Sequence, residues 1–515
     1  MKRSIFIPVL TFFAAFVLFL ASCSKTDDMI VTPPPPPPPP PTPTPVVKPN
    51  QEFYGITAAN ALVKYNANAS QTVISNVAVT GLQAGENLLA IDFRPATGQL
   101  YGLGNTNRIY VINTETGVAR AIGAAPFTPA IIGTVAGFDF NPTVDRIRVV
   151  TSAGQNLRLN PETGAVAAID ANINNTEKIS GVAYTNSYAG ASATTLFDID
   201  GFSFYKQDPP NNGTITRIGF LGLDVVATGG NDFDISPDNK VALIPMTVNG
   251  VNSLYQLDTA NAKLVNLGQL ATAIIGLAIP TNPVGYGVDN ANNLSIFDLS
   301  SPAFGVTKAI TGLQGGETIL GIDMRPATGQ LYALGSTSRL YTINMSSGAA
   351  TAVSAAPFTT LLSGTSFGFD FNPTVDRIRV VSNTGQNLRL DPNTGLIAAV
   401  DGSLNPGTPN VASAAYTNNF AGATTTSLYV IDATTDRLYI QNPPNNGTLV
   451  DVGPLGINIT ADNGFDIGGR SGKAYGLFSI GALTKLYTLD LTTGLVVGQV
   501  DFPGVAKGFA VGLGF

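Results

Sequence analysis

Apolar side chains recur along most of this chain in short runs that alternate with polar residues, without the period of a helix. Val, Ile, Leu, Tyr and Phe dominate these runs, and turn pairs such as Thr116-Gly117 and Asn446-Gly447 separate them. This pattern predicts many short β-strands joined by tight turns. Outside the N-terminal segment no stretch shows a sustained helical period, so we expect an all-β fold.

The pattern occurs twice. The block GFDFNPTVDRIRVV begins at Gly137 and again at Gly368, and RPATGQLY begins at Arg94 and again at Arg325, so both blocks recur at an offset of 231 residues (368 minus 137). GQNLRL, AYTN and PPNNGT recur at nearly the same offset. An internal repeat of this length indicates a tandem duplication. We refer to residues 51–281 as copy 1 and to residues 282–515 as copy 2.

Each copy contains a weaker repeat of roughly 45 residues, which is the length of one four-stranded propeller blade. The repeat gives about five units per copy. The expected fold is therefore a β-propeller arranged as two tandem five-bladed rings.

The ends of the copies indicate how such rings would close. Residues 53–57 and 286–289 resemble second strands of units that lack a first strand, and the chain ends on a first-strand pattern at 508–515. A C-terminal strand that completes the first sheet removes free sheet edges. Residues 275–280 either close copy 1 in this way or pair onward with Tyr286. The second arrangement would make one continuous ring of about ten blades, and we favour the first.

The N-terminus is typical of an exported lipoprotein. Lys2 and Arg3 precede an apolar stretch, and the small residues Ala21 and Ser22 precede Cys23. A transmembrane anchor is the less favoured alternative, because the apolar stretch is short for a membrane span and contains Pro8. We therefore expect a signal peptide over 1–22 and lipidation at Cys23.

Residues 23–50 are expected to tether the folded part to a membrane. Residues 33–41 are all proline, and a polyproline II helix of that length spans roughly 28 Å. Ser24, rather than an aspartate, follows the lipidated cysteine, which favours the outer membrane. The predicted location is the outer membrane, through the lipid anchor, with the folded part facing the periplasm or the cell surface.

The amino-acid composition excludes several classes of catalytic and metal-binding site. The sequence contains no histidine, and Cys23 is its only cysteine, which excludes Ser/His/Asp triads and the usual zinc sites. The formal net charge of −7 is the opposite of what a nucleic-acid-binding protein needs. We expect no cofactor, no metal and no nucleic-acid partner.

The densest group of polar residues lies in the duplicated blocks. If neighbouring runs form adjacent strands, arginine and asparagine side chains share one face of a blade. This face is either an anion-binding or glycan-binding patch or, as we favour, a salt-bridge network between blades. The candidate residues are Asp139, Asn141, Asp145, Arg146, Arg148, Asn156 and Arg158 in copy 1, and Asp370, Asn372, Asp376, Arg377, Arg379, Asn387 and Arg389 in copy 2.

Other acidic residues have simpler expected roles. Asp92, Asp139 and Asp234 each begin an Asp-x-x-Pro corner, where the side chain is expected to bond backbone amides two residues on. Glu86 and Glu317 occupy matching positions in turn-like segments, where exposure to solvent is expected. A calcium loop at 170–174 lacks the closing acidic ligand.

The duplicated blocks GFDFNPTVDRIRVV and GQNLRL resemble the signature of a bacterial family of secreted or lipid-anchored proteins, catalogued as a domain of unknown function. The resemblance covers both copies and implies no catalytic residue. We expect a non-catalytic module of the cell envelope that binds a glycan or protein partner. The alternatives are a hydrolase that uses aspartates on a carbohydrate or lactone, and a structural envelope protein.

Overall fold

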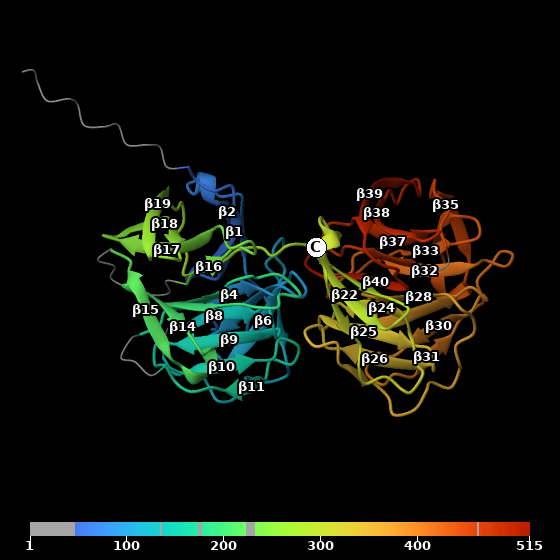
Figure 1. The fold of residues 1–515 in the computed structure, drawn as a ribbon, viewed down its shortest axis with the longest axis horizontal. Helices are drawn as coiled ribbons and strands as arrows, with labels where there is room; N and C mark the ends of the chain where they lie inside the picture. Colours follow the sequence, from blue (N-terminus) through green and yellow to red (C-terminus); the bar gives the residue numbers. More distant parts are fainter. Residues whose placement is uncertain (1–46, 134–135, 174–177, 223–231, 461–462) are drawn as a thin grey trace, which may run out of the picture. The chain divides into compact units, whose positions relative to one another are not determined.

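The computed structural model describes residues 47–515 except 134–135, 174–177, 223–231 and 461–462 (Figure 1). The expected signal peptide, Cys23 and the proline run lie outside the described residues. The part from Val46 to Phe515 is one compact unit. Among the described residues no helix has the length and apolar character needed to cross a membrane.

The described chain is all-β, as predicted. Its strands form ten antiparallel sheets of four strands each. The only helical elements described are four short 3-10 turns, η1 (Ala67–Ala69), η2 (Pro210–Asn212), η3 (Pro302–Phe304) and η4 (Pro444–Asn446).

Copy 1 contains five of the sheets. In strand order they are β20 (Gly276–Ala278), β1 (Glu52–Ile56), β2 (Ala61–Asn66) and β3 (Ser75–Ala78); β4 (Leu88–Phe93), β5 (Leu100–Gly104), β6 (Arg108–Ile112) and β7 (Ala119–Ile122); β8 (Ala136–Asn141), β9 (Arg146–Thr151), β10 (Asn156–Leu159) and β11 (Val166–Ile169); β12 (Gly181–Tyr184), β13 (Leu196–Ile199), β14 (Ser203–Gln207) and β15 (Ile215–Phe220); and β16 (Asp234–Ile235), β17 (Ala242–Val248), β18 (Val251–Asp258) and β19 (Lys263–Gln269).

Copy 2 contains the other five sheets in the same arrangement. They are β40 (Gly508–Val511), β21 (Val284–Val288), β22 (Asn293–Asp298) and β23 (Val306–Ala309); β24 (Ile319–Arg325), β25 (Gln330–Gly335), β26 (Arg339–Ile343) and β27 (Ala350–Ala352); β28 (Phe367–Asn372), β29 (Arg377–Ser382), β30 (Asn387–Leu390) and β31 (Ile397–Val400); β32 (Val411–Tyr416), β33 (Leu428–Asp432), β34 (Arg437–Gln441) and β35 (Leu449–Pro454); and β36 (Asn463–Ile467), β37 (Ala474–Ile480), β38 (Leu483–Leu489) and β39 (Val496–Phe502).

The last strand of each copy returns to the first sheet of the same copy. In copy 1, β20 pairs with β1, with Leu277 opposite Gly55. In copy 2, β40 pairs with β21, with Ala510 opposite Tyr286. The strand at 276–278 therefore closes copy 1, and does not pair onward with the strand that contains Tyr286.

One strand of each sheet contacts the neighbouring sheets, and we call it the inner strand. In copy 2 the inner strands β24, β28, β32, β36 and β40 contact one another in cyclic order. In copy 1 the inner strands β20, β4, β8, β12 and β16 follow the same order, and a hydrogen bond from Ile279 N to Asp234 connects β16 with the end of β20.

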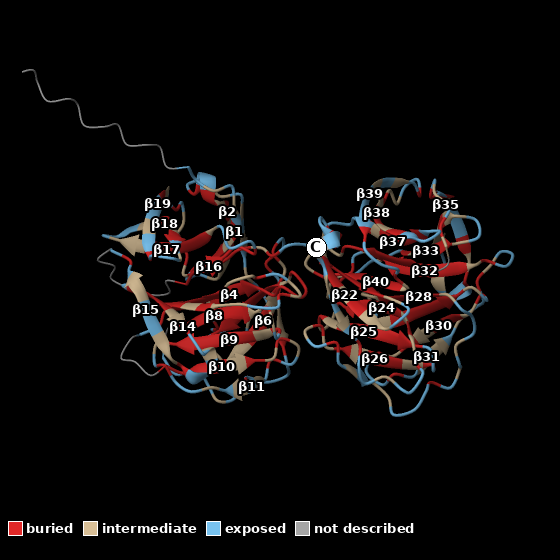
Figure 2. Ribbon diagram, in the orientation of Figure 1, coloured by how far each residue is buried: buried red, intermediate tan, exposed pale blue. Residues whose placement is uncertain are grey.

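Hydrophobic side chains fill the spaces between adjacent sheets. One core cluster, for example, combines Tyr101 and Ile109 of one sheet with Phe138 and Val149 of the next. In Figure 2 the buried colour follows the inner and middle strands, whereas β15 at an outer edge carries exposed and half-exposed positions. The described core therefore lies between sheets.

Candidate functional site

Arg148 in β9 lies at the centre of a polar network in copy 1. Its Nη1 donates to Asn156 Oδ1 at 2.7 Å and to Asp170 Oδ2 at 2.6 Å. Its Nε donates to the Tyr184 hydroxyl at 3.2 Å and its Nη2 to Asn211 Oδ1 at 2.7 Å. The side chain is buried. Tyr184 lies in β12 of the next sheet along the chain, and Asn211 lies in the turn η2 between strands β14 and β15 of that sheet. Arg148 thus joins two sheets, and all three of its guanidinium nitrogens have internal partners.

Arg158 completes the charge balance of this network. Its Nε and Nη2 form a two-pronged ion pair with Asp170, with both N···O distances at 2.8 Å. Burial alone would raise the pKa of Asp170, but the hydrogen bonds and charges of Arg158 and Arg148 outweigh it and hold that pKa below its ordinary value. Asp170 is therefore a stable anion between two arginines.

Copy 2 repeats this network. Arg379 donates to Asn387 at 2.8 Å, to Asp401 at 2.6 Å and to the hydroxyl of Tyr416 at 3.3 Å. It also donates to Asn445 at 2.8 Å, and Arg389 pairs with Asp401 at 2.8 Å and 2.9 Å. The arrangement is therefore present in both copies of the duplicated domain.

Asp145 and Arg146 do not join the Arg148 network. Asp145 pairs with the fully buried Arg94, whose Nε donates to its Oδ1 at 2.9 Å. Arg146 donates to the backbone oxygen of Asp145 at 2.8 Å. Arg325, Asp376 and Arg377 repeat these contacts in copy 2.

Asn141 and Asn372 serve turns. The side-chain oxygen of Asn141 accepts bonds from the backbone N and the hydroxyl of Thr143, and that of Asn372 accepts the same pair from Thr374. The expected single face of arginines, asparagines and aspartates is therefore divided among three separate arrangements: the arginine networks, the Arg94 and Arg325 pairs, and these turns.

Asp139 lies in none of these three arrangements but in a separate group of acidic residues, which we call carboxylate cluster 1. It consists of Asp92, Asp139 and Asp234, which come from the inner strands β4, β8 and β16. One carboxylate oxygen from each lies within 4.8 Å of the others, and all three residues are buried.

The aspartates of the Asp-x-x-Pro corners do not make the local hydrogen bonds that the sequence predicted. Asp92 accepts from the adjacent Phe93 N at 2.7 Å and from Phe140 N of the neighbouring inner strand at 2.8 Å. Asp139 accepts from Tyr184 N of the next inner strand at 3.1 Å. The amide two residues on is not the partner, because the carboxylates turn inward and connect one inner strand to the next.

Copy 2 contains carboxylate cluster 2, formed by Asp323, Asp370 and Asp466 with the same spacing. Their partners are the backbone amides of Phe371, Tyr416 and Val511 on the next inner strand, at 2.7 Å, 2.9 Å and 2.6 Å. Burial raises the pKa of all six carboxyls, to about 7 for Asp234 and Asp466. Burial therefore disfavours the charged form of these carboxyl groups.

Glu86 is buried, contrary to the expected solvent exposure. It is 3 % exposed, and its carboxylate accepts from the hydroxyl groups of Thr106 and Tyr110. Glu317 makes the same contacts with Thr337 and Tyr341. Each glutamate ties its turn to the following hairpin, an interaction between segments about twenty residues apart that a turn-like local pattern does not reveal.

Several members of these networks were missed by sequence reasoning. They are Arg94, Asp170 and Asn211 in copy 1 and their counterparts Arg325, Asp401 and Asn445 in copy 2. All six are identical between the copies at or near the 231-residue offset. A position-by-position comparison of the copies would have detected them.

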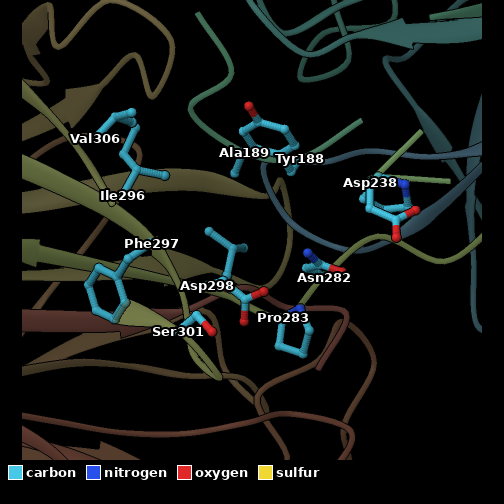
Figure 3. Close-up of a pocket in the computed structure, with 12 residues that line it drawn as sticks. Tyr188, Ala189, Asp238, Asn282, Pro283, Ile296, Phe297, Asp298, Ser301 and Val306 are labelled. Atoms are coloured by element: carbon cyan, nitrogen blue, oxygen red, sulfur yellow. The ribbon is translucent and has the colours of Figure 1, made fainter. Parts of the chain in front are cut away.

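The structure also contains an open pocket of about 330 Å³ (Figure 3). Its two carboxylates serve their own turns, since Asp238 accepts from the Ser236 hydroxyl at 2.7 Å and Asp298 from that of Ser300 at 2.6 Å. The lining residues are Tyr188, Ala189, Pro237, Asp238, Asn282, Pro283, Val284, Ile296, Phe297, Asp298, Ser301 and Val306.

The sheets and buried networks define a duplicated all-β repeat protein. The chain belongs to the family described as a domain of unknown function (DUF4394), whose model matches residues 61–278 and 293–510 and thus occurs as two tandem copies. The resemblance inferred from the duplicated blocks is confirmed.

No curated protein matches the chain. Among solved structures, the chain is similar at 12 % identity and a TM-score of 0.24 to PorZ, an essential bacterial surface component of the type-IX secretion system of Porphyromonas gingivalis. The match covers 88 % of this chain and 58 % of that one.

Proposed function

We propose that this chain is an outer-membrane lipoprotein whose folded part is a non-catalytic module that binds a glycan or protein partner of the cell envelope. The arginines and aspartates of the networks that the two copies share form hydrogen bonds and ion pairs with other residues of the fold. The surface, by contrast, offers an aromatic feature that one copy has and the other lacks.

We further propose that each group of five sheets is a five-bladed propeller. Three features support this arrangement: four strands per sheet, cyclic contacts between inner strands, and a last strand that joins the first sheet. In this architecture the carboxylate clusters would lie where the five inner strands converge.

The observation that carries the binding proposal is an exposed aromatic surface on the β14–β15 hairpin. Phe220 is 67 % exposed and Phe202 is 52 % exposed. Ser203, next to Phe202, pairs directly with Phe220, and the Arg217 guanidinium lies 4.5 Å from the Phe220 ring centroid. Stacked aromatic and guanidinium groups suit a sugar ring or an apolar side chain of a partner.

Copy 2 provides a comparison for this surface. The corresponding hairpin, β34–β35, has Asp436 and Pro454 at the positions of Phe202 and Phe220. Asp451 replaces Arg217 and pairs with Arg437 at 2.8 Å. Because folding evidently does not require the aromatic residues at these positions, their presence in copy 1 supports a binding role.

The test uses the full-length protein in detergent and a variant with Phe202→Ser, Arg217→Ser and Phe220→Ser. Calorimetry against purified envelope polysaccharide tests for a glycan partner. A photo-crosslinking residue at the exposed position 216 of β15, introduced into the wild type and into both variants, tests for a protein partner in intact cells. The matched control variant carries Arg437→Ser and Asp451→Ser in copy 2.

We expect binding or crosslinking with the wild type and the control, and its loss in the triple variant. Equal binding by the triple variant would contradict the role of this surface. If neither experiment detects binding, the proposed function is contradicted, and the alternative of a structural envelope protein is favoured.

The hydrolase alternative makes a different prediction. Asp139 and Asp370 are only 2 % and 1 % exposed, so a substrate has no direct access to them. We expect no activity on glycosides or lactones. Turnover that is abolished by Asp139→Ala and Asp370→Ala, in variants with unchanged circular dichroism, would favour the enzyme instead.

A further inference from the structure

Carboxylate cluster 1 has the spacing of ligands around a single cation. One oxygen each from Asp92, Asp139 and Asp234 lies within 4.8 Å of the others. Oxygen ligands lie at about 2.3–2.6 Å from Ca²⁺, so two ligands of one ion are at most about 5 Å apart. The three carboxylates meet this limit without rearrangement.

A fourth carboxylate, Asp232, lies beside the cluster. Asp232 and Asp234 are two residues apart in an extended segment and so share a face, while Phe233 and Ile235 pack into a hydrophobic cluster on the other face. Asp232 is 1 % exposed, and its Oδ2 has no hydrogen-bond partner among the described residues.

The described structure provides no positive side chain for these groups. No described lysine or arginine forms a salt bridge with Asp92, Asp139, Asp232 or Asp234. Backbone amides stabilise the carboxylates in part, through Phe140, Tyr184 and Ile279 of neighbouring strands. Buried charges usually persist only when paired or bound to a metal. A bound cation would stabilise all four carboxylates in their charged form.

We propose that Asp92, Asp139, Asp232 and Asp234 bind one Ca²⁺ ion, which holds the inner strands of copy 1 together. All available ligands are oxygen atoms, which excludes ions that prefer nitrogen or sulfur. Mg²⁺ retains several of its waters, whereas Ca²⁺ accepts a set of protein oxygens in flexible geometry. The burial of all four carboxylates favours Ca²⁺. This inference is independent of the proposed binding function.

Copy 2 is the internal comparison. Cluster 2 has three carboxylates with the same spacing, but Gly464 occupies the position of Asp232. Calcium affinity depends on the number of charged ligands. Copy 2 should therefore bind Ca²⁺ more weakly than copy 1.

The test measures Ca²⁺ binding by the full-length protein in detergent, after removal of metal with a chelator. Calorimetry with CaCl₂ and with MgCl₂ gives the affinities, and thermal unfolding with and without about 1 mM CaCl₂ gives the effect on stability. Metal analysis of the untreated protein shows whether it retains calcium from the cell. Two variants follow: Asp232→Asn removes a ligand, and the control Asp238→Asn changes a partly exposed carboxylate in the next turn.

We expect one tight Ca²⁺ site that Mg²⁺ does not fill, and a higher melting temperature with Ca²⁺. Asp232→Asn should weaken the tight site about tenfold or more, and Asp238→Asn should leave it unchanged. If Asp232→Asn does not fold, Asp139→Asn replaces it, because the amide oxygen can still accept from Tyr184 N.

Three results would overturn the proposal. The first is a metal-free protein with no Ca²⁺-dependent heat or melting shift and no calcium before chelation. The second is equal Ca²⁺ affinity in Asp232→Asn and the wild type. The third is preferential binding of Mg²⁺. The first result would indicate that the cluster consists of carboxylic acids that share protons and do not bind a metal ion.

Discussion

Asp198 and Val430 occupy equivalent buried positions in the two copies, but only the valine suits its apolar surroundings. Val430 packs in a hydrophobic cluster. Asp198 is fully buried, and neither of its carboxylate oxygens has a hydrogen-bond partner among the described residues. Strand β13 has the sequence Leu-Phe-Asp-Ile, and β33 begins with Leu-Tyr-Val-Ile. The residues on either side of Asp198 and Val430 are therefore similar in the two copies. The copies thus provide a natural test of what a buried, unpartnered carboxylate does to stability.

Asp198→Val should stabilise the protein. An unsatisfied buried polar group costs about 1–3 kcal/mol, and valine at this position is already accommodated in copy 2. We expect a higher melting temperature, measured by calorimetry. The reciprocal change Val430→Asp should lower it, and a lower melting temperature for Asp198→Val would refute this explanation.

The gain from Asp198→Val should depend on pH. Burial raises the pKa of Asp198 well above its ordinary value, so the folded state binds a proton that the unfolded state releases. A wild-type protein with such a group loses stability as pH rises above the unfolded pKa near 3.8. The difference in melting temperature between variant and wild type should therefore be larger at neutral pH than in acid, and an opposite trend would contradict the assigned protonation.

Arg148→Ala and Arg379→Ala should each destabilise the protein. Either change removes a partner from a buried carboxylate, Asp170 or Asp401, and such losses cost about 3–5 kcal/mol. Thermal unfolding is the measurement. Arg158→Ala, at a half-exposed side chain of the same network, should have a smaller effect. Unchanged melting of both buried-arginine variants would favour the binding-patch interpretation.

The contribution of Arg158 should disappear in acid. Arg158 and Arg148 hold the pKa of Asp170 below its ordinary value of 3.8, against the effect of burial. A group with a lowered pKa contributes stability above its unfolded pKa and loses it as pH falls. The difference in melting temperature between wild type and Arg158→Ala should be complete at pH 7 and narrow below about pH 4. A constant difference across this range would show that Arg158 acts by packing alone.

Gly508→Ala should destabilise copy 2. A Cβ atom at Gly508 would lie 2.9 Å from the Cα of Gly321 in the neighbouring inner strand, and a backbone atom cannot move aside as a side chain can. Such overpacking costs about 1–3 kcal/mol. Gly315→Ala is the control, because nothing lies within 4 Å of its new Cβ. Equal melting temperatures of the two variants would show that β40 and β24 can move apart at little cost.

The sequence predicted the fold better than the site. Short alternating runs and the 231-residue offset predicted the strands and the duplication, because both depend on local pattern and identity. The return of residues 276–278 to Gly55 was one of two alternatives, since distant pairing cannot be read from alternation. Asp170 lay in a weak calcium-loop pattern, and only the pairing of β9, β10 and the next sheet brings Arg148 and Arg158 to it.

The carboxylate clusters show why inward-facing residues are hard to predict. Asp92 and Asp234 have the local sequence of a turn-capping aspartate, and the prolines three residues on, Pro95 and Pro237, fit that interpretation. Their partners are Phe140 and Ile279, which lie 45 or more residues away on other inner strands. A corner that recurs from unit to unit indicates a shared structural role, but not the direction in which its side chain points.

The return of β20 to β1, and of β40 to β21, sets an order for folding during synthesis. The N-terminal part of a chain emerges first, so β1 has no inner neighbour until residues 276–278 have been made. Copy 1 can then close before copy 2 exists, whereas β21 must wait for the last eight residues of the chain. Long-range closure of this kind folds slowly and leaves an unpaired strand edge in the meantime. A nascent chain that stalls before residue 508 would therefore have a folded copy 1 and an unpaired, aggregation-prone edge at β21.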